Sequence, residues 1–414
     1  MAEKLKNLLL LTLLLLMGLL LVATFWVSAR GAGGQFDLLQ STEDLGGVQD
    51  APVSPAQPEV LALLAEQGIH LAESIGGYSQ LWQQAEPVFQ EAVGSAATPE
   101  ALSEGAYRGL LKAPGVLLQY HTALPFYLFQ AWGGSEQLRE TPEIRGAALV
   151  VEGERVSLLL TDREGGRWKA TTAASASEIR TLCENAPGVN AVLAENSRAL
   201  ASDEVLTTRV ERFAALTVTE AEIAVKNELS QTMQALFGLN PYLTRVYPDA
   251  DGSLVYVEGH GTVRLSPAGD LTYTGTGVEL ELNDGAALER HAEICRKTQD
   301  LLRRLWQQAG ASGVLCLNSV ELQNGSGTLR FGLQLEGVVL EKDRGDWATA
   351  TVEQGRITGM TVSPRLLTAE ASVQLLPGRQ AETMLPQGQA RLRVRLLEQG
   401  DGTMVPQRCR VTED

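Results

Sequence analysis

The longest uninterrupted apolar stretch of the chain lies at its start, where residues 8–27 carry no charged side chain. A helix rises about 1.5 Å per residue, so about twenty residues span the roughly 30 Å hydrocarbon core of a bilayer. Lys4 and Lys6 precede the stretch, and Arg30 follows it. By the positive-inside rule, residues 1–7 are cytoplasmic and the bulk of the chain is extracytoplasmic. The pattern predicts a single-pass protein of the cell membrane with a transmembrane helix over 8–27.

The alternative interpretation of this stretch is a cleaved signal peptide, because Val27-Ser28-Ala29 fits a small-residue cleavage site. Apolar regions of signal peptides usually run over only ~7–15 residues, and Trp26 suits an interfacial position. The length therefore favours an uncleaved anchor. Both interpretations leave the remainder of the chain outside the cell.

Residues 28–58 predict a linker, because glycines and prolines alternate there with acidic residues and leave no apolar pattern for a core. Beyond the linker, residues 59–205 predict an N-terminal extracytoplasmic α+β domain. Its predicted helices are 59–69, 78–93 and 125–132, and its predicted strands are 115–120, 147–152, 155–161 and 167–172.

Residues 206–285 predict a middle helix-plus-sheet domain. Thr219 and Glu222 have the spacing of a capping box, and Gly238 ends the helical pattern. The apolar stripe of this helix consists of Val225, Leu229, Met233, Leu236 and Phe237. The predicted strands are 244–247, 254–258, 262–265 and 271–274.

Residues 286–414 predict a C-terminal helix-plus-sheet domain, which begins with a long helix over 286–308. The other predicted elements are strands at 314–322, 328–335, 347–353, 356–362, 390–397 and 403–411 and a short helix at 377–385. A helix followed by an antiparallel meander thus recurs along the chain. Helices grouped before antiparallel strands that are joined by tight turns indicate the α+β class.

Composition narrows the function classes. Hydrophobic residues make up 44% and charged residues 20% of the 414, which is typical of a globular protein and not of a disordered one. The formal net charge of −16 repels nucleic acid and anionic lipid, so no nucleic-acid partner is expected.

Three stretches of the outer chain carry a family resemblance. They are Pro114–Tyr120 with Leu124–Phe126 and Ala131–Gly133, Val255–Gly259 running into Thr262–Tyr273, and Gly337–Val339 with Ala348–Ile357. Together with the anchor and the chain length, they resemble the YycH/YycI family of membrane-anchored accessory regulators of two-component systems in Gram-positive bacteria. The second half also looks like the helix-on-sheet repeats of that group and of PepSY-type modules. One departure is Pro406-Gln407-Arg408-Cys409, where the family often closes its last strand with Pro-x-Trp.

The resemblance implies a non-enzymatic extracytoplasmic regulator. It implies as partners a sister YycH/YycI-type protein and a sensor histidine kinase that controls cell-wall metabolism. It implies no catalytic residues and no cofactor. In the anchor, Gly18 is a candidate partner contact, because helices associate in lipid by close packing at small residues. Its alternative is a glycine that is merely tolerated.

Catalytic patterns do not compete strongly with this interpretation. The chain has no Gly-x-Ser-x-Gly elbow, Walker loop or His-Glu-x-x-His motif, and Gly275-Thr276-Gly277 lacks the third glycine of a nucleotide loop. The four histidines, His70, His121, His260 and His291, are scattered. Carboxylates are abundant, so an envelope ligand-binding protein or a cell-wall hydrolase with an unrecognised carboxylate site stays the alternative function. A deep pocket with converging carboxylates would favour the alternative, and a flat sheet with an apolar patch would favour the regulator.

Metal and disulfide chemistry are weakly indicated. His291 and Cys295 lie one helical turn apart, but Cys295 falls on the apolar stripe of its helix, so we expect a buried thiol and no metal site. Asp249-Ala250-Asp251-Gly252 resembles the start of a calcium loop and lacks its later ligands, so a hairpin turn is favoured. The cysteines, Cys183, Cys295, Cys316 and Cys409, allow three disulfide pairings, and the sequence does not select among them.

Overall fold

The computed structural model describes residues 54–72, 77–140, 142–184, 188–194, 197–220, 223–240, 242–259, 261–388, 390–399 and 402–412. The predicted transmembrane helix over 8–27, including Gly18, lies outside these residues, as does the linker up to residue 53. Within the described ranges, no helix combines the length and apolarity needed to cross a bilayer. The chain from Ser54 onward belongs to one compact unit, and the three domain boundaries predicted within it stay predictions.

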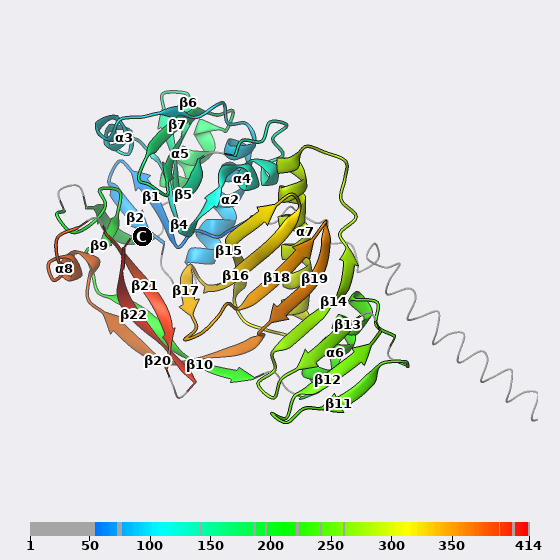
Figure 1. Cartoon of the computed structure of the whole chain (residues 1–414). Coiled ribbons are helices and arrows are strands. Elements are labelled where there is room, and N and C mark those ends of the chain that lie inside the picture. The colour runs from blue at the N-terminus through cyan, green and yellow to red at the C-terminus, as the bar shows by residue number, and fades with distance from the viewer. Residues whose placement is uncertain are drawn as a thin grey trace, which may run out of the picture. The chain divides into compact units, whose positions relative to one another are not determined.

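The first half of the described chain builds a nine-stranded sheet with the order β3-β7-β6-β5-β4-β1-β2-β8-β9 (Figure 1). Its strands are β1 (Val60–Ala65), β2 (Gly68–Leu71), β3 (Glu100–Ala101), β4 (Gly115–Pro125), β5 (Glu143–Glu152), β6 (Arg155–Asp162), β7 (Arg167–Thr171), β8 (Val189–Leu193) and β9 (Val205–Thr207). Its helices are α2 (Tyr78–Gly94), α3 (Glu104–Leu110), α4 (Phe126–Trp132) and α5 (Ala176–Glu184). All neighbouring strands of this sheet pair antiparallel.

The second half builds a thirteen-stranded sheet with the order β11-β12-β13-β14-β19-β18-β16-β17-β21-β22-β10-β20, and β15 pairs with β16 off this path. Its strands are β10 (Glu211–Glu220), β11 (Arg245–Pro248), β12 (Leu254–Glu258), β13 (Gly261–Leu265), β14 (Leu271–Glu279), β15 (Val314–Gln323), β16 (Ser326–Leu335), β17 (Val338–Glu341), β18 (Ala348–Glu353), β19 (Arg356–Val362), β20 (Arg365–Leu375), β21 (Ala390–Glu398) and β22 (Thr403–Thr412). Its helices are α6 (Ile223–Leu236), α7 (Ala287–Gln308) and α8 (Gly378–Glu382). The strands β17 and β21 pair in parallel, and the other pairs are antiparallel.

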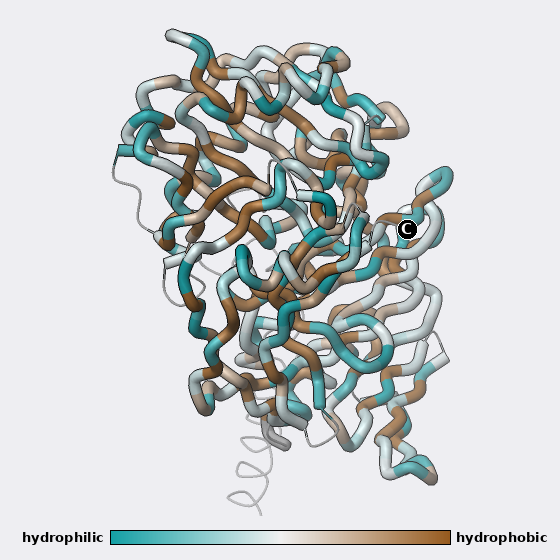
Figure 2. Tube along the Cα trace, turned by 90° about the vertical axis from the view of Figure 1, so that its left-hand side faces the viewer, coloured by the Kyte–Doolittle hydropathy of each residue, from teal (hydrophilic) through white to brown (hydrophobic). Residues whose placement is uncertain are grey.

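The two faces of the large sheet differ in polarity because side chains alternate along a strand. On β18, Ala348, Ala350 and Val352 are buried, whereas Thr349 lies at intermediate exposure and Thr351 is exposed. The buried face packs against α6 and α7, and these helices lie behind the strands in Figure 1. Figure 2 shows the resulting alternation of hydrophobic and hydrophilic positions along the chain. The opposite face of β18 therefore carries its polar side chains.

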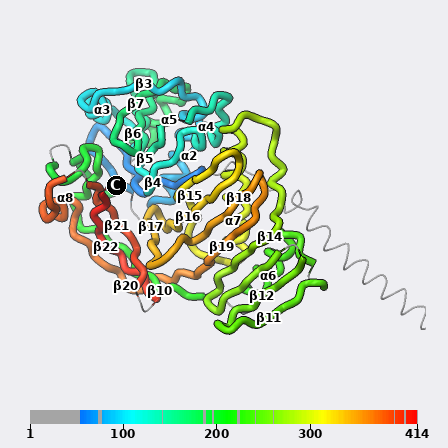
Figure 3. Tube along the Cα trace, viewed as in Figure 1, coloured from blue at the N-terminus to red at the C-terminus, as the bar shows by residue number. Residues whose placement is uncertain are grey.

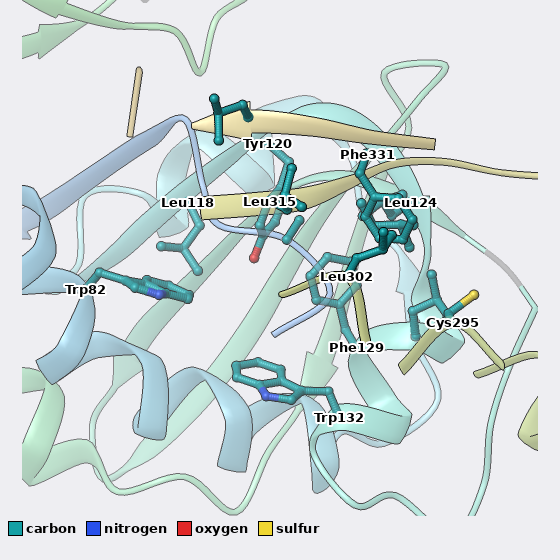
Figure 4. Close-up of a cluster of buried hydrophobic side chains, with 14 of the residues drawn as sticks. Trp82, Leu118, Tyr120, Leu124, Phe129, Trp132, Cys295, Leu302, Leu315 and Phe331 are labelled. Carbon is teal, nitrogen blue, oxygen red and sulfur yellow. The ribbon is translucent and has the colours of Figure 1, made fainter. Parts of the chain in front are cut away.

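One hydrophobic core extends across both sheets. Figure 4 shows Trp82, Phe129 and Trp132 of the first half gathered beside Leu302 and Phe331 of the second. Because apolar contact between the two sheets is continuous, the helices predicted in separate domains share one interior. The last residues of the predicted linker also join it: Gln299 on α7 donates a hydrogen bond to the Ser54 carbonyl oxygen at 3.1 Å.

Most elements predicted from the pattern are confirmed. The predicted helix over 59–69 is wrong, because this segment forms the antiparallel hairpin of β1 and β2. The residues of β1 from Val60 to Leu64 are all buried, since the strand lies inside the sheet between β4 and β2. A short apolar run with no alternation cannot be distinguished from a buried helix by periodicity.

The predicted capping box at Thr219 is also wrong. Thr219 lies on β10, where it pairs with Leu366 and donates its hydroxyl to the Leu366 carbonyl oxygen at 3.3 Å. Strands β3, β8, β9, β10, β17 and β20 were not predicted from the pattern. They are short, or they carry mixed side chains on both faces, so their apolar periodicity is weak.

Candidate functional site

Three arginines on alternate positions of β21 form the most unusual chemical feature of the described chain. Arg391, Arg393 and Arg395 share one face of the strand, since successive side chains point to opposite sides. Their side chains are only 4%, 3% and 11% exposed. Buried arginines are rare unless they are paired. We call this row the arginine ladder; β21 is drawn in red, beside β22, in Figure 3.

Each arginine of the ladder lies close to carboxylates from distant parts of the chain, and neighbouring arginines share Glu204 or Glu59. Arg391 lies 3.5 Å from Asp203, which lies in a turn, and 3.6 Å from Glu204, which immediately precedes β9. Arg393 contacts Glu204 directly and lies 3.2 Å from Glu59, which immediately precedes β1.

The last rung reaches the other sheet. Arg395 contacts Glu341 at the end of β17 and lies 3.7 Å from Glu59. Its Nη2 also lies 3.1 Å from Nδ1 of His121 on β4. Arg393 adds a second link to β4, because its Nη2 donates to the Gln119 Oε1 at 2.7 Å. The ladder therefore joins β1 and β4 of the first sheet to β17 and β21 of the second.

A further arginine extends the network to α3. Arg167 on β7 lies 3.0 Å from Glu104 and 3.6 Å from Asp203, and its guanidinium stacks 4.6 Å from the centre of the Tyr107 ring. The carboxylate of Asp203 therefore lies close to two guanidinium groups, those of Arg391 and Arg167.

The enclosure changes the titration of these groups. Burial alone would raise the pKa of Asp203, but Arg391 and Arg167 outweigh it and hold that pKa below its usual value. Burial raises the pKa of Glu204, although Arg393 and Arg391 act against it. Burial together with the neighbouring Arg395 lowers the pKa of His121 to about 4, so this imidazole is neutral at physiological pH. A neutral Nδ1 can accept the hydrogen bond of Arg395.

The site leaves no room for a substrate. Glu59, Asp203 and Glu204 are each at most 4% exposed and are enclosed by arginines. A hollow lies beside His121 and is also lined by Tyr120, Cys316 and Asn318. Its volume of about 10 Å³ holds at most one water molecule. The arrangement fits a structural joint better than a hydrolytic carboxylate pair, which needs space for a glycosidic bond and water.

The structure separates the residues that motif reasoning had grouped. His291 on α7 accepts a hydrogen bond at Nε2 from the Gly325 N–H, while Cys295 packs into the core. Burial raises the pKa of Cys295 to about 12, which keeps the thiol protonated and a poor metal ligand. No group of His, Cys, Asp and Glu that could hold a metal ion occurs among the residues that the structure places. Asp249 and Asp251 both pair with Arg264, at 3.0 Å and 2.7 Å, around the β11–β12 turn.

Other predicted site residues do not converge. His70 lies on β2 and His121 on β4, His260 is outside the described residues, and so is Gly18. The cysteines Cys183, Cys295, Cys316 and Cys409 are all free thiols in this structure.

The arginine ladder was not predicted from the sequence, although the sequence contains one signal of it. The strand over 390–397 was predicted, and its alternation of Arg with Leu and Val was visible within it. An alternating strand is normally interpreted as a solvated polar face over a buried apolar face. The burial of this polar face becomes visible only in the tertiary structure.

The comparisons with known proteins address the fold. No family model matches the chain. No curated protein matches it either. Among solved structures, YycH from Bacillus subtilis superposes with a TM-score of 0.56 at 11% sequence identity, over 87% of this chain and 94% of that one.

The chain has a YycH-like fold. The predicted α+β class is confirmed for the described residues, which form mostly antiparallel sheets and seven helices. At this identity the likeness concerns the architecture and does not transfer residue roles.

Proposed function

We propose that this protein is a non-enzymatic, extracytoplasmic regulator of a two-component system. In this proposal its outer part binds a sister YycH/YycI-type protein, a sensor histidine kinase, or both, and residues 8–27 hold it in the cell membrane. The observation that carries the proposal is the YycH-like fold, which extends over 87% of the chain. The family resemblance of the sequence and the predicted anchor support it independently of the structure.

The chemistry of the described residues is consistent with a role in binding and offers little for catalysis. The most polar cluster, the arginine ladder, is closed and internally neutralised. The buried thiols of Cys295 and Cys316 have pKa values raised to about 12, so neither is an activated nucleophile.

A crosslinking pull-down from membranes tests the proposal. The tagged full-length chain is crosslinked in its native membrane, purified under denaturing conditions and analysed by mass spectrometry. We expect a sensor histidine kinase or a second anchored protein of the same fold among the crosslinked chains. Purified protein that hydrolyses cell-wall material, with no such partner recovered, would overturn the proposal in favour of the envelope enzyme.

The contribution of the anchor is tested separately. Secreting residues 28–414 without the anchor should lose regulation of kinase autophosphorylation if contact within the membrane matters. Gly18→Leu should weaken regulation and leave the complex recoverable, because stable interfaces of roughly 800 Å² per partner are more readily built by the outer part. A Gly18→Leu chain that loses the complex, together with an outer part that binds no partner, would contradict this division of labour.

A further inference from the structure

Strand β11 forms one end of the thirteen-stranded sheet (Figure 1). A group of large apolar side chains on and beside this strand is exposed. Tyr242 and Leu243 are 81% and 67% exposed, and Val246 and Tyr247 are about half exposed. Val257 on β12 is 36% exposed and pairs directly with Arg245 on β11. Arg245, Tyr247 and Val257 lie on one face of the sheet, whereas Val246, which alternates with Arg245 and Tyr247, lies on the other face. We call Tyr242, Leu243, Arg245, Tyr247 and Val257 the β11 patch. Nearby exposed apolar residues of this size indicate an interaction site more often than single ones do.

The backbone at this edge is poorly suited to strand addition. The Asp249 N–H donates to the Ser253 carbonyl oxygen, so by antiparallel alternation Tyr247 and Arg245 also bond inward, and Val246 and Pro248 face the free edge. A proline protects an edge because it has no N–H to offer an incoming strand, and Pro248 holds such a position here. A partner would therefore contact this surface chiefly through side chains.

Arg245 is the unmatched charge of the patch. It forms no ion pair with any carboxylate that the structure describes, whereas Arg264 nearby is paired with both Asp249 and Asp251. The carboxylate of Glu258 is also engaged, since it accepts hydrogen bonds from the Asn240 N–H and the Thr244 hydroxyl. The patch thus offers apolar surface and one cation that has no ion-pair partner among the described residues, while the nearby Asp249, Asp251 and Glu258 contact other groups.

We propose that the β11 patch docks a segment of a partner protein that presents apolar side chains and a carboxylate for Arg245. This inference rests on the proposed function and names the surface that performs it. Tyrosine and arginine are the residue types that most often dominate protein interfaces, and both are present here.

Charge decides between this occupant and two others. In a two-fold contact between copies of the chain, the patch would face itself, and none of the residues of the patch is an acid that could pair with Arg245. An anionic lipid surface would attract Arg245 but repel the remainder of a chain whose formal net charge is −16. A protein segment with a local carboxylate satisfies Arg245 without bringing a large negative surface close.

The test is site-specific photocrosslinking of the full-length chain in its native membrane. A photoreactive phenylalanine replaces Tyr247 in one variant and Met384, which is 76% exposed on a different surface, in a control variant. We expect position 247 to crosslink to another membrane-anchored protein, at a peptide that contains apolar residues and an Asp or Glu. Position 384 should give about tenfold less of that product.

Charge substitutions make the test more specific. Arg245→Glu should lower the crosslinking yield at position 247 about tenfold, Arg245→Lys should largely retain it, and a partner acid changed to Lys should restore the yield with Arg245→Glu. Thermal unfolding of each variant should match that of the parent, because these side chains are exposed.

The contrary outcomes are distinct. Yields that do not change with Arg245→Glu, crosslinks only to a second copy of the chain, or recovery of the variant on anionic vesicles in place of a protein would each overturn the inference. If general crosslinking still recovers the kinase or the sister protein from the Arg245→Glu and Tyr247→Ser chains at the parental level, the inference fails and the proposed function stands. If the unmodified chain recovers neither, the proposed function itself fails.

Discussion

The arginine ladder and the β11 patch both invert the usual distribution of side chains, and they do so in opposite ways. In the ladder, arginines and carboxylates are buried; in the patch, tyrosines and aliphatic side chains are exposed. The difference is in how their charges are matched. The rungs of the ladder meet carboxylates of the same chain, whereas Arg245 of the patch meets none among the described residues. Charges that are paired within the chain indicate a contact between segments of the same chain. A charge without a partner beside exposed apolar side chains indicates an interface with another protein.

The ladder is better understood as a device that specifies the arrangement of the two sheets than as a source of stability. Removing two ions from water costs several kcal/mol each, and a well-packed apolar replacement is often equally stable. A single broken pair is a different matter, since the remaining ion stays buried without compensation. Because Glu59, Gln119 and Glu341 lie far apart in sequence, the ladder ties distant segments into one register.

The largest effect that separates the two regions is expected from Arg393→Met. This substitution leaves Glu204 and Glu59 buried with less positive charge, so we expect a loss of about 3–5 kcal/mol in the free energy of unfolding. Urea unfolding of the full-length chain in detergent measures it. The matched control is Arg356→Met, which removes an arginine from a surface pair with Glu279 at 3.1 Å and should cost less than about 1 kcal/mol. Equal losses in the two variants would show that the ladder is not a special joint.

A second effect is expected from pH, through His121. Its pKa of about 4 in the folded chain lies below the ordinary value of 6.5. Between these two pH values the unfolded chain therefore binds a proton at His121 that the folded chain does not bind. Stability is therefore fully present above about pH 6.5 and is lost as the pH falls toward 4, by about 3 kcal/mol over the whole window. His121→Asn should flatten this part of the profile of unfolding free energy against pH. A profile for His121→Asn that still falls as steeply as the parental one would contradict the assignment.

A smaller loss is expected at the outer end of the network. Arg167→Met removes the pair with Glu104 and the stacking on Tyr107, but Asp203 keeps Arg391 as a partner. We expect a loss of about 2 kcal/mol, below that of Arg393→Met, from the same urea experiment. A loss larger than that of Arg393→Met would move the centre of the joint from β21 to β7.

The smallest effect on stability is expected from the patch. Tyr247 is about half exposed and lies outside the hydrophobic core, so Tyr247→Ser should change the free energy of unfolding by less than about 0.5 kcal/mol. Partner capture, measured by the crosslinking yield described above, should nevertheless fall. A substitution that destabilises the chain and leaves capture intact would reverse the roles assigned to the two regions.

The pattern of apolar positions predicted elements correctly where one face of an element is buried and the other is exposed to solvent. The helix α7 was predicted from its stripe, and the hairpins of β11 to β14 were predicted from alternation and from Asp-Gly and Pro-Ala-Gly turns. It failed at β1, where Val60 to Leu64 are buried on both faces and show no period. It also missed β20, which pairs with β10 and is exposed over much of its length.

The candidate sites show the same division. The charge of −16, the anchor pattern and the family resemblance came from the sequence alone, because composition and periodicity are local properties. The exposure of Tyr242 and Tyr247 did not, since a tyrosine in a strand pattern is equally compatible with a core position.

Turns, the apolar faces of helices and short motifs depend on residues that are close in sequence. The amino-acid order alone therefore established that helices alternate with antiparallel meanders along the chain. It also established that the chain carries no familiar catalytic motif. The placement of the charges followed from the three-dimensional arrangement. Arg393 contacts Glu204, which is 189 positions away in the sequence, and Gln119, which is 274 positions away. It also lies close to Glu59. Whether an alternating arginine is solvated or buried depends on which distant strand covers it, and no local pattern encodes that.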